Sequence, residues 1–153
     1  AVANRNAPGQ IVLSGELAAL DAVEAGASLH GVRRAIRLSV AGGFHSECMR
    51  PAAERLKAAL REVELSAPKV PVVSNVTARP ISGPEEAREL LAQQVCSPVL
   101  WEDSVRWMIS EDITAFLEPS PGSVLSGILR KIDRDAVCVS ADVPAVDEEM
   151  HTS

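Results

Sequence analysis

The sequence predicts an α/β fold that contains a parallel sheet. Short β-branched runs alternate with stretches whose apolar residues recur at helical spacing, which is the order that parallel α/β sheets require. Pro, Gly and Asn separate these stretches and mark turns. Hydrophobic residues form 46% of the 153 residues and charged residues 24%, so the chain can bury a core of ordinary composition.

The first forty residues predict strand, strand, helix and strand. Residues 2–3 suit the end of a strand, residues 4–9 have turn chemistry, and residues 10–14 suit a buried strand. A helix is expected over residues 16–29, with Gly31 as its stop. Residues 33–40 alternate polar and apolar side chains, as a half-exposed strand does. Together they predict a split β-α-β sheet that lacks its opening strand and helix.

The rest of the chain predicts helices and strands in alternation. A helix is expected from about Met49 to residue 63, with Pro51 in its first turn. The β-branched run at residues 69–76 predicts a buried parallel strand. Further helices are expected over residues 83–98, 101–109 and 124–132, strands over residues 113–118 and 136–140, and an acidic frayed tail over the last dozen residues.

Composition excludes several classes of protein. A net charge of −6 disfavours a nucleic-acid partner, whose binding face would be basic. Three cysteines without ligand spacing indicate neither a disulfide framework nor a metal site, and they fit a reducing, cytoplasmic setting. No apolar run approaches the length of a membrane span. The first residue is not Met, which leads us to expect a chain cut from something longer.

One histidine lies where α/β folds collect reactive groups. His45 follows Gly42 and Gly43 directly after the predicted strand over residues 33–40. Imidazole exchanges protons near neutral pH, so it is the usual partner that activates a serine hydroxyl. An ordinary surface-loop histidine fits the same pattern. Ser46 beside it suits a helix cap better than a nucleophile, because catalytic Ser and His converge from distant segments.

No serine of this chain suits the nucleophile role. None has glycine both two residues before and two residues after it, which the G-x-S-x-G elbow requires; Ser126 lies beside Gly127 but within a predicted helix. Gln94 falls on the apolar face of its predicted helix, so its amide is either a satisfied structural group or part of a polar site. The turn at residues 118–123 places a helix N-terminus that can face an anion, although a tight connection is the simpler interpretation.

Five blocks of sequence carry a resemblance when they are read in order. They are NRNAPGQIVLSG, GFHSECMRPAA, VPVVSNV, QVCSPVLW and EPSPGSVLSG, at residues 4–15, 43–53, 70–76, 94–101 and 118–127. In this order they resemble the malonyl-CoA:acyl carrier protein transacylase family over about residues 1–132. The resemblance implies an α/β-hydrolase-like acyltransferase core with an inserted ferredoxin-like subdomain.

The resemblance also implies a division of the chain. Residues 1–40 would form a partial ferredoxin-like subdomain of order β-β-α-β, and residues 41–140 the C-terminal part of the α/β acyltransferase core. Residues 141–153 would be an acidic, disordered tail. The N-terminal half of the same enzyme, which carries the nucleophile elbow, the oxyanion hole and the arginine for the malonyl carboxylate, is missing from the chain.

The activity that the resemblance implies is [acyl-carrier-protein] S-malonyltransferase by a ping-pong Ser-His mechanism in fatty-acid biosynthesis. His45 matches the general base, and the backbone carbonyl of Gln94 would orient it. Phe44 matches the residue that is typical of malonyl-specific members, and Asn6, Gln10 and Arg34 match positions that line the substrate channel. Malonyl-CoA and acyl carrier protein are the expected partners. No cofactor or metal is expected.

Two other functions fit the same residues. One is the acyltransferase domain of a polyketide synthase. The other is a non-catalytic module that binds acyl carrier protein through Arg33, Arg34 and Arg37, although these arginines also suit a solvated face. Because the chain has a base and no nucleophile, we expect it to be inactive in malonyl transfer when it is alone.

Overall fold

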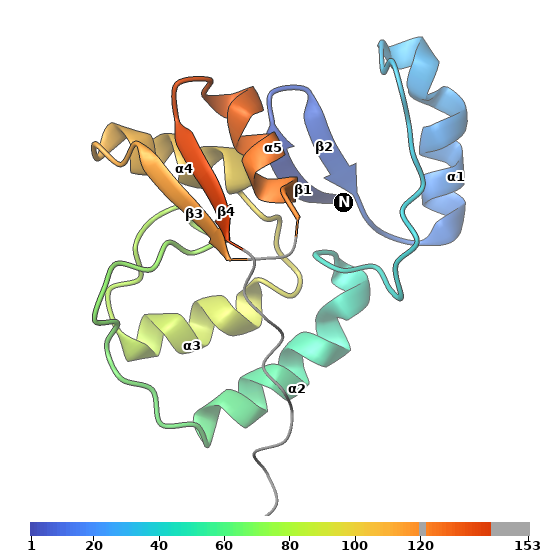
Figure 1. Ribbon diagram of the computed structural model, residues 1–153. Helices are drawn as coiled ribbons and strands as arrows, with labels where there is room; N and C mark the ends of the chain where they lie inside the picture. Colours follow the sequence, from blue (N-terminus) through green and yellow to red (C-terminus); the bar gives the residue numbers. More distant parts are fainter. Residues whose placement is uncertain (120–121, 142–153) are drawn as a thin grey trace, which may run out of the picture.

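The structure is a computed structural model that describes residues 1–119 and 122–141. These residues contain five α-helices and four strands, and the strands form two separate two-stranded sheets (Figure 1). One sheet pairs its strands antiparallel and the other pairs them parallel. The predicted acidic tail lies outside the described residues, apart from Ala141.

The antiparallel sheet is a hairpin of β1 (Val2–Ala7) and β2 (Gln10–Leu13). Its turn is confined to Pro8 and Gly9, whose φ of 73° suits a residue without a side chain. Residues 4–6, which were predicted as part of the turn, instead extend β1. The reason is pairing on both edges: β1 also bonds to Val99, from Arg5 N to Val99 O at 2.9 Å and from Val99 N to Ala3 O at 2.8 Å.

A helix and an irregular segment follow the hairpin. Helix α1 (Leu17–Gly26) continues as the 3₁₀ turn η1 (Ala27–His30), and Gly31 stops it with a φ of 75°, as predicted. The strand prediction for residues 33–40 is wrong. These residues are exposed and pair with no strand of the described chain, so their alternating pattern has no sheet to join. Arg37 instead bonds to Glu24 and Asp21 of α1.

Two helices form the lower part of the molecule in Figure 1. Helix α2 (Arg50–Arg61) packs against α3 (Pro84–Gln93), and each carries a proline in its first turn. The guanidinium of Arg88 on α3 bonds to the Leu60 carbonyl near the end of α2. The strand prediction for residues 69–76 is also wrong, because the described chain offers only the isolated bridge between Val73 and Pro80.

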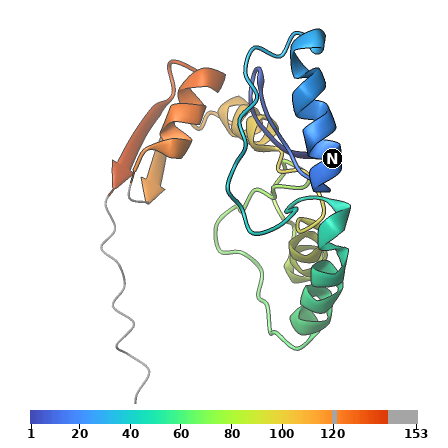
Figure 2. The same cartoon turned by 90° about the vertical axis from the view of Figure 1, so that its right-hand side faces the viewer.

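The parallel sheet confirms the predicted α/β order. Strand β3 (Ala115–Pro119) pairs with β4 (Val137–Ala141) in the register Phe116 to Cys138, and α5 (Val124–Ile132) connects them. Helix α4 (Trp101–Ser110) precedes β3 and contacts both β1 and α5. The turned view of Figure 2 shows β3, β4 and α5 grouped at one side of the molecule, with α1 and α2 at the other.

The described chain leaves much apolar surface uncovered. Few large apolar side chains of the described chain are almost fully buried; Val105 on α4 leaves 1% of its surface exposed and Leu129 on α5 leaves 3%. Large apolar residues are more than half exposed on several elements: Ile11, Leu17, Leu29, Ile36, Leu38, Val40, Val70, Leu117, Val124, Val137 and Val139. Exposed apolar surface of this extent is typical of an interaction site. None of the helices in the described residues is long and apolar enough to span a bilayer.

Candidate functional site

The loop before α2 places His45 against the end of α3. His45 has a φ of 60°, in the left-handed region that residues other than glycine seldom adopt. Its backbone N donates to the Val95 carbonyl at 3.0 Å, although the two residues lie fifty positions apart in the chain. The 3₁₀ turn η2 (Glu47–Met49) then leads directly into α2. A strained residue held by a long-range bond is a common sign of a functional site.

The imidazole of His45 bonds to a backbone carbonyl. Its Nδ1 lies 2.8 Å from the Gln94 backbone oxygen. Since a carbonyl only accepts, Nδ1 carries the proton in this contact and the neutral ring has its lone pair on Nε2. Within residues 1–119 and 122–141 no hydrogen bond engages Nε2, so the half-buried side chain presents a proton acceptor on its other edge. A carbonyl here takes the orienting position that a carboxylate occupies in a Ser-His-Asp triad.

Gln94 is suited to this task because it ends a helix. It is the C-cap of α3, and its own N donates to the Leu90 carbonyl at 2.9 Å. Carbonyls in the last turn have no partner within the helix and carry the negative end of its dipole, so they are good acceptors. Besides His45, the Gln94 oxygen takes only a long bond from Ser97 N at 3.4 Å in the described chain.

Asn75 supports Gln94, and sequence reasoning missed it. Its Nδ2 lies 3.4 Å from Gln94 Oε1, and its backbone oxygen accepts from Leu100 N at 2.9 Å. The sequence left open whether the Gln94 amide is a satisfied structural group or part of a polar site. The contact with Asn75 gives this amide a polar partner, although Gln94 was predicted on an apolar helix face. An asparagine within the apolar run of residues 70–76 was the available signal.

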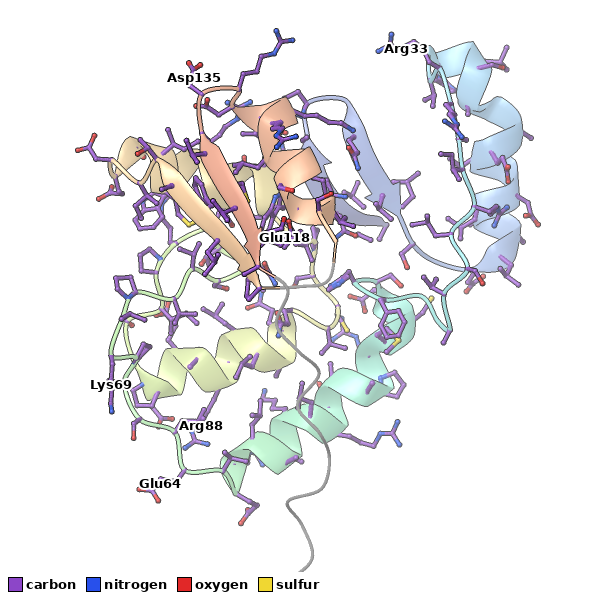
Figure 3. The ribbon with its side chains drawn as sticks, viewed as in Figure 1. Arg33, Glu64, Lys69, Arg88, Glu118 and Asp135 are labelled. Atoms are coloured by element: carbon purple, nitrogen blue, oxygen red, sulfur yellow. The ribbon has the colours of Figure 1, made fainter. Side chains whose placement is uncertain are left out.

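The four other predicted site residues do not contact His45 or Gln94 through hydrogen bonds in the described chain. Gln10 begins β2, and its Oε1 accepts from Lys131 Nζ at 2.8 Å. Asn6 lies half-buried in β1, and Phe44 leaves 46% of its surface exposed beside His45. Arg34 lies in the exposed irregular segment after α1. Figure 3 shows the side chain of its neighbour Arg33 pointing away from α1.

The structure disfavours an anion site at the N-terminus of α5, which the sequence left as the less simple interpretation. The Glu118 carboxylate already occupies it, accepting from Leu125 N and Ser126 N at 2.9 Å each (Figure 3). These two bonds lower the pKa of Glu118 from its ordinary value, and the bond from Leu125 N has the larger effect. They stabilise the charged carboxylate although only 5% of the residue is exposed. A phosphate would have to displace a carboxylate of the same sign, which disfavours an anion site at the start of α5.

The described residues hold no cluster of three or more His, Cys, Asp or Glu side chains that suits a metal ion. Cys48, Cys96 and Cys138 are free thiols. The chemistry present at His45 is therefore that of an oriented imidazole with a carbonyl behind it. It can accept a proton at Nε2 and return it, which a serine or thiol nucleophile requires.

Comparison with known proteins decides the family. Residues 1–149 match the family model of the acyl transferase domain. The chain belongs to this acyl transferase family. Among curated acyl transferases, the malonyl CoA-acyl carrier protein transacylase of Bacillus subtilis is 41% identical over 147 residues. That match covers 96% of this chain and 46% of the relative, so the chain spans about half the length of the curated relatives it matches, in their C-terminal portion.

Solved structures show that this half has the acyl transferase fold. The acyl-carrier-protein-S-malonyltransferase of Bartonella henselae has a TM-score of 0.89 and 38% identity, over 94% of this chain and 46% of that one. A type II PKS acyl-carrier protein in complex with its malonyl-transacylase, PlMCAT:AntF, gives a TM-score of 0.89 at 31% identity, over 92% of this chain and 46% of that one. The predicted fold class, the C-terminal part of an α/β acyltransferase core, is confirmed.

Proposed function

We propose that this chain supplies the general base of an [acyl-carrier-protein] S-malonyltransferase. The observation that carries the proposal is the 2.8 Å contact from His45 Nδ1 to the Gln94 carbonyl, which leaves Nε2 free to take a proton. The relatives from Bacillus subtilis and Bartonella henselae are named for malonyl transfer to acyl carrier protein, which supports these substrates. Malonyl-CoA is then the donor and the phosphopantetheine thiol of the carrier is the acceptor.

The proposed reaction has two matched steps. His45 Nε2 takes the proton of a serine hydroxyl, whose oxygen attacks the malonyl thioester carbonyl; the C–S bond breaks and the CoA sulfur leaves with the proton from Nε2. In the second step Nε2 takes the proton of the carrier thiol, the sulfur attacks the malonyl ester, and the serine oxygen leaves with that proton. No atom changes oxidation state, so the exchange requires no redox cofactor.

The serine comes from outside these residues. No serine of the chain has the glycines of a nucleophile elbow, and the chain matches only about half of its relatives. We propose that the polypeptide corresponding to the unmatched N-terminal part of the relatives supplies it and covers apolar side chains such as Ile11, Val70 and Leu117. The chain alone would accordingly fail to transfer malonyl.

Four side chains would contribute to substrate binding. Phe44 precedes the base and is exposed, so its ring is placed to restrict the size of the acyl group beside His45. Asn6, Gln10 and Arg34 would line the channel between the subdomains. Of these, Gln10 would have to release Lys131 before it bonds to a substrate.

A complementation assay tests the proposal. The 153-residue chain is assayed for transfer of labelled malonyl from malonyl-CoA to holo acyl carrier protein, alone and with the unmatched N-terminal part of the Bacillus subtilis relative. We expect no transfer alone and transfer with the complement. His45→Ala in the active mixture should lower kcat/KM by about 10²–10⁴-fold, the typical contribution of a general base. Transfer by the chain alone, or an unchanged rate in His45→Ala, would contradict the proposal.

The polyketide alternative stays open because of one comparison. The PlMCAT:AntF structure pairs a malonyl-transacylase with a type II PKS acyl-carrier protein, so a relative of the same fold serves that carrier. Rates with carriers from fatty-acid and polyketide systems would separate the two. The non-catalytic alternative is weaker, because Arg37, one of its three arginines, is already paired with Glu24 and Asp21.

A further inference from the structure

A buried hydroxyl closes the turn that contains His45. The Ser46 side chain has only 3% of its surface exposed. Its Oγ donates to the Gly43 carbonyl at 2.5 Å and accepts from Cys48 N at 3.3 Å. The first bond closes a ring over residues 43–46, and the second extends it into η2. The backbone on both sides of His45 is therefore fixed by one side chain.

The same turn is tightly packed. A Cβ atom at Gly43 would lie 3.2 Å from Ser46 Oγ, so the hydroxyl sits directly against the glycine backbone. Both bonds of His45, from its N to Val95 O and from its Nδ1 to Gln94 O, reach consecutive carbonyls at the end of α3. His45 makes these two bonds in a left-handed conformation, with a φ of 60°. That conformation is unfavourable for histidine and persists only where the surroundings impose it.

We propose that Ser46 is a positioning residue for His45. Its hydroxyl holds the turn in the left-handed conformation and thereby keeps the proton of the imidazole on Nδ1, against the Gln94 carbonyl. Ser46 makes no contact with the reacting atoms in this role. The inference rests on the proposed function for its effect on catalysis, whereas its effect on the imidazole can be measured without activity.

The direct test is ¹⁵N NMR of the histidine rings in the 153-residue chain. We expect His45 to carry its proton on Nδ1, and Ser46→Ala to move the population toward the Nε2–H tautomer. His30, which is exposed on η1, serves as the internal reference that should not change. In the complemented enzyme, Ser46→Ala should lower kcat about tenfold with KM unchanged, the size expected when buried polar groups lose their partner.

The chain offers a close control in Ser126. This serine is also 3% exposed, and its Oγ donates to the carbonyl three residues earlier, Ser123 O, at 3.0 Å. Ser126→Ala removes the same atom from an equally buried site on α5, away from His45. The proposal requires that it leave the His45 tautomer and kcat unchanged. An equal effect of both variants would show loss of general stability and overturn the proposal, as would an unaltered imidazole in Ser46→Ala.

Two further variants keep the test decisive. Ser46→Thr keeps the hydroxyl and should restore the wild-type tautomer. If Ser46→Ala does not fold, Ser46→Cys keeps the size of the side chain with a weaker hydrogen-bonding group, and it should show the same shift to a smaller extent. A tautomer shift without loss of malonyl transfer would contradict the proposed function of His45 and leave the positioning intact. Loss of transfer in His45→Ala with no tautomer shift in Ser46→Ala would support the proposed function of His45 and contradict the positioning role of Ser46.

Discussion

Gly43→Ala is the substitution whose effect the structure constrains most closely. The backbone of Gly43 lies outside the left-handed region, so alanine meets no conformational barrier there. Its methyl group would lie 3.1 Å from Cys48 Cβ and 3.2 Å from Ser46 Oγ. Carbon atoms in contact are normally about 3.5–4.0 Å apart, so the turn must open by roughly 0.4 Å.

The expected change in stability is the difference of two effects. Crowding a packed site costs about 1–3 kcal/mol. Replacing glycine also restricts the unfolded chain, which stabilises the folded state by about 0.4–1 kcal/mol. The midpoints of these two ranges differ by about 1.3 kcal/mol, and we therefore expect Gly43→Ala to lower the free energy of unfolding by about that amount. Because the turn opens at Ser46, the His45 tautomer should shift in the same direction as in Ser46→Ala.

Urea unfolding followed by far-ultraviolet circular dichroism measures this change. If the slope of the unfolding free energy against urea concentration is unaltered, the folded and unfolded states expose the same surface in variant and wild type. Gly127→Ala is the control. Gly127 lies within α5, and no atom outside its own helix backbone lies within 4 Å of the place that an alanine methyl would take, so alanine should stabilise the helix by about 0.5–1 kcal/mol. A Gly43→Ala variant that is as stable as the wild type, while Gly127→Ala gains stability, would refute the claim that this turn is closely packed.

Two more perturbations have expected outcomes. Glu118→Gln should lower the unfolding midpoint at pH 7, because the lowered pKa of Glu118 means that its charged form is bound more strongly in the folded state. That stabilisation is present above the unfolded pKa of about 4.3 and disappears as the pH falls through the lower folded pKa, so the two proteins should converge in acid. A gap that is constant with pH would contradict this. Arg34→Ala in the complemented enzyme should raise KM for malonyl-CoA or carrier protein several-fold and keep kcat, whereas Arg106→Ala, on α4 and paired with Glu102, should leave both parameters unchanged. A lower kcat in Arg34→Ala would place this arginine in the chemistry instead.

Helices were predictable from the sequence because their signals are local. Pro51 and Pro84 mark helix starts, Gly31 marks a stop, and the residue spacing of α5 predicted its bounds without error. Strands depend on partners that can lie anywhere in the chain. Residues 33–40 and 69–76 have strand composition, but the described chain offers neither of them a neighbouring strand. Propensity alone therefore placed strands where no ladder can form.

The site was predictable in part for the same reason. Sequence reasoning singled out His45 from its loop and Gln94 from its place on an apolar helix face, and the structure brings the two together. Asn75 was missed because its contact joins residues nineteen positions apart, and no spacing rule connects an irregular segment to the end of a later helix. The occupied α5 N-terminus was missed because the sequence cannot show that Glu118 folds back onto the helix that follows it.

The orientation of the His45 imidazole is a property of this half of the fold alone. Every group that orients His45 lies between Gly43 and Val95: the Ser46 hydroxyl, the Val95 and Gln94 carbonyls, and Asn75 behind Gln94. None of these contacts requires a nucleophile to be present. The proton can therefore be placed on Nδ1 without any serine nearby. Under the proposed function, a serine brought by the complementing polypeptide would meet an Nε2 lone pair that is already available. Such an arrangement would lower the reorganisation needed at the moment of proton transfer, which is how preorganised sites gain rate.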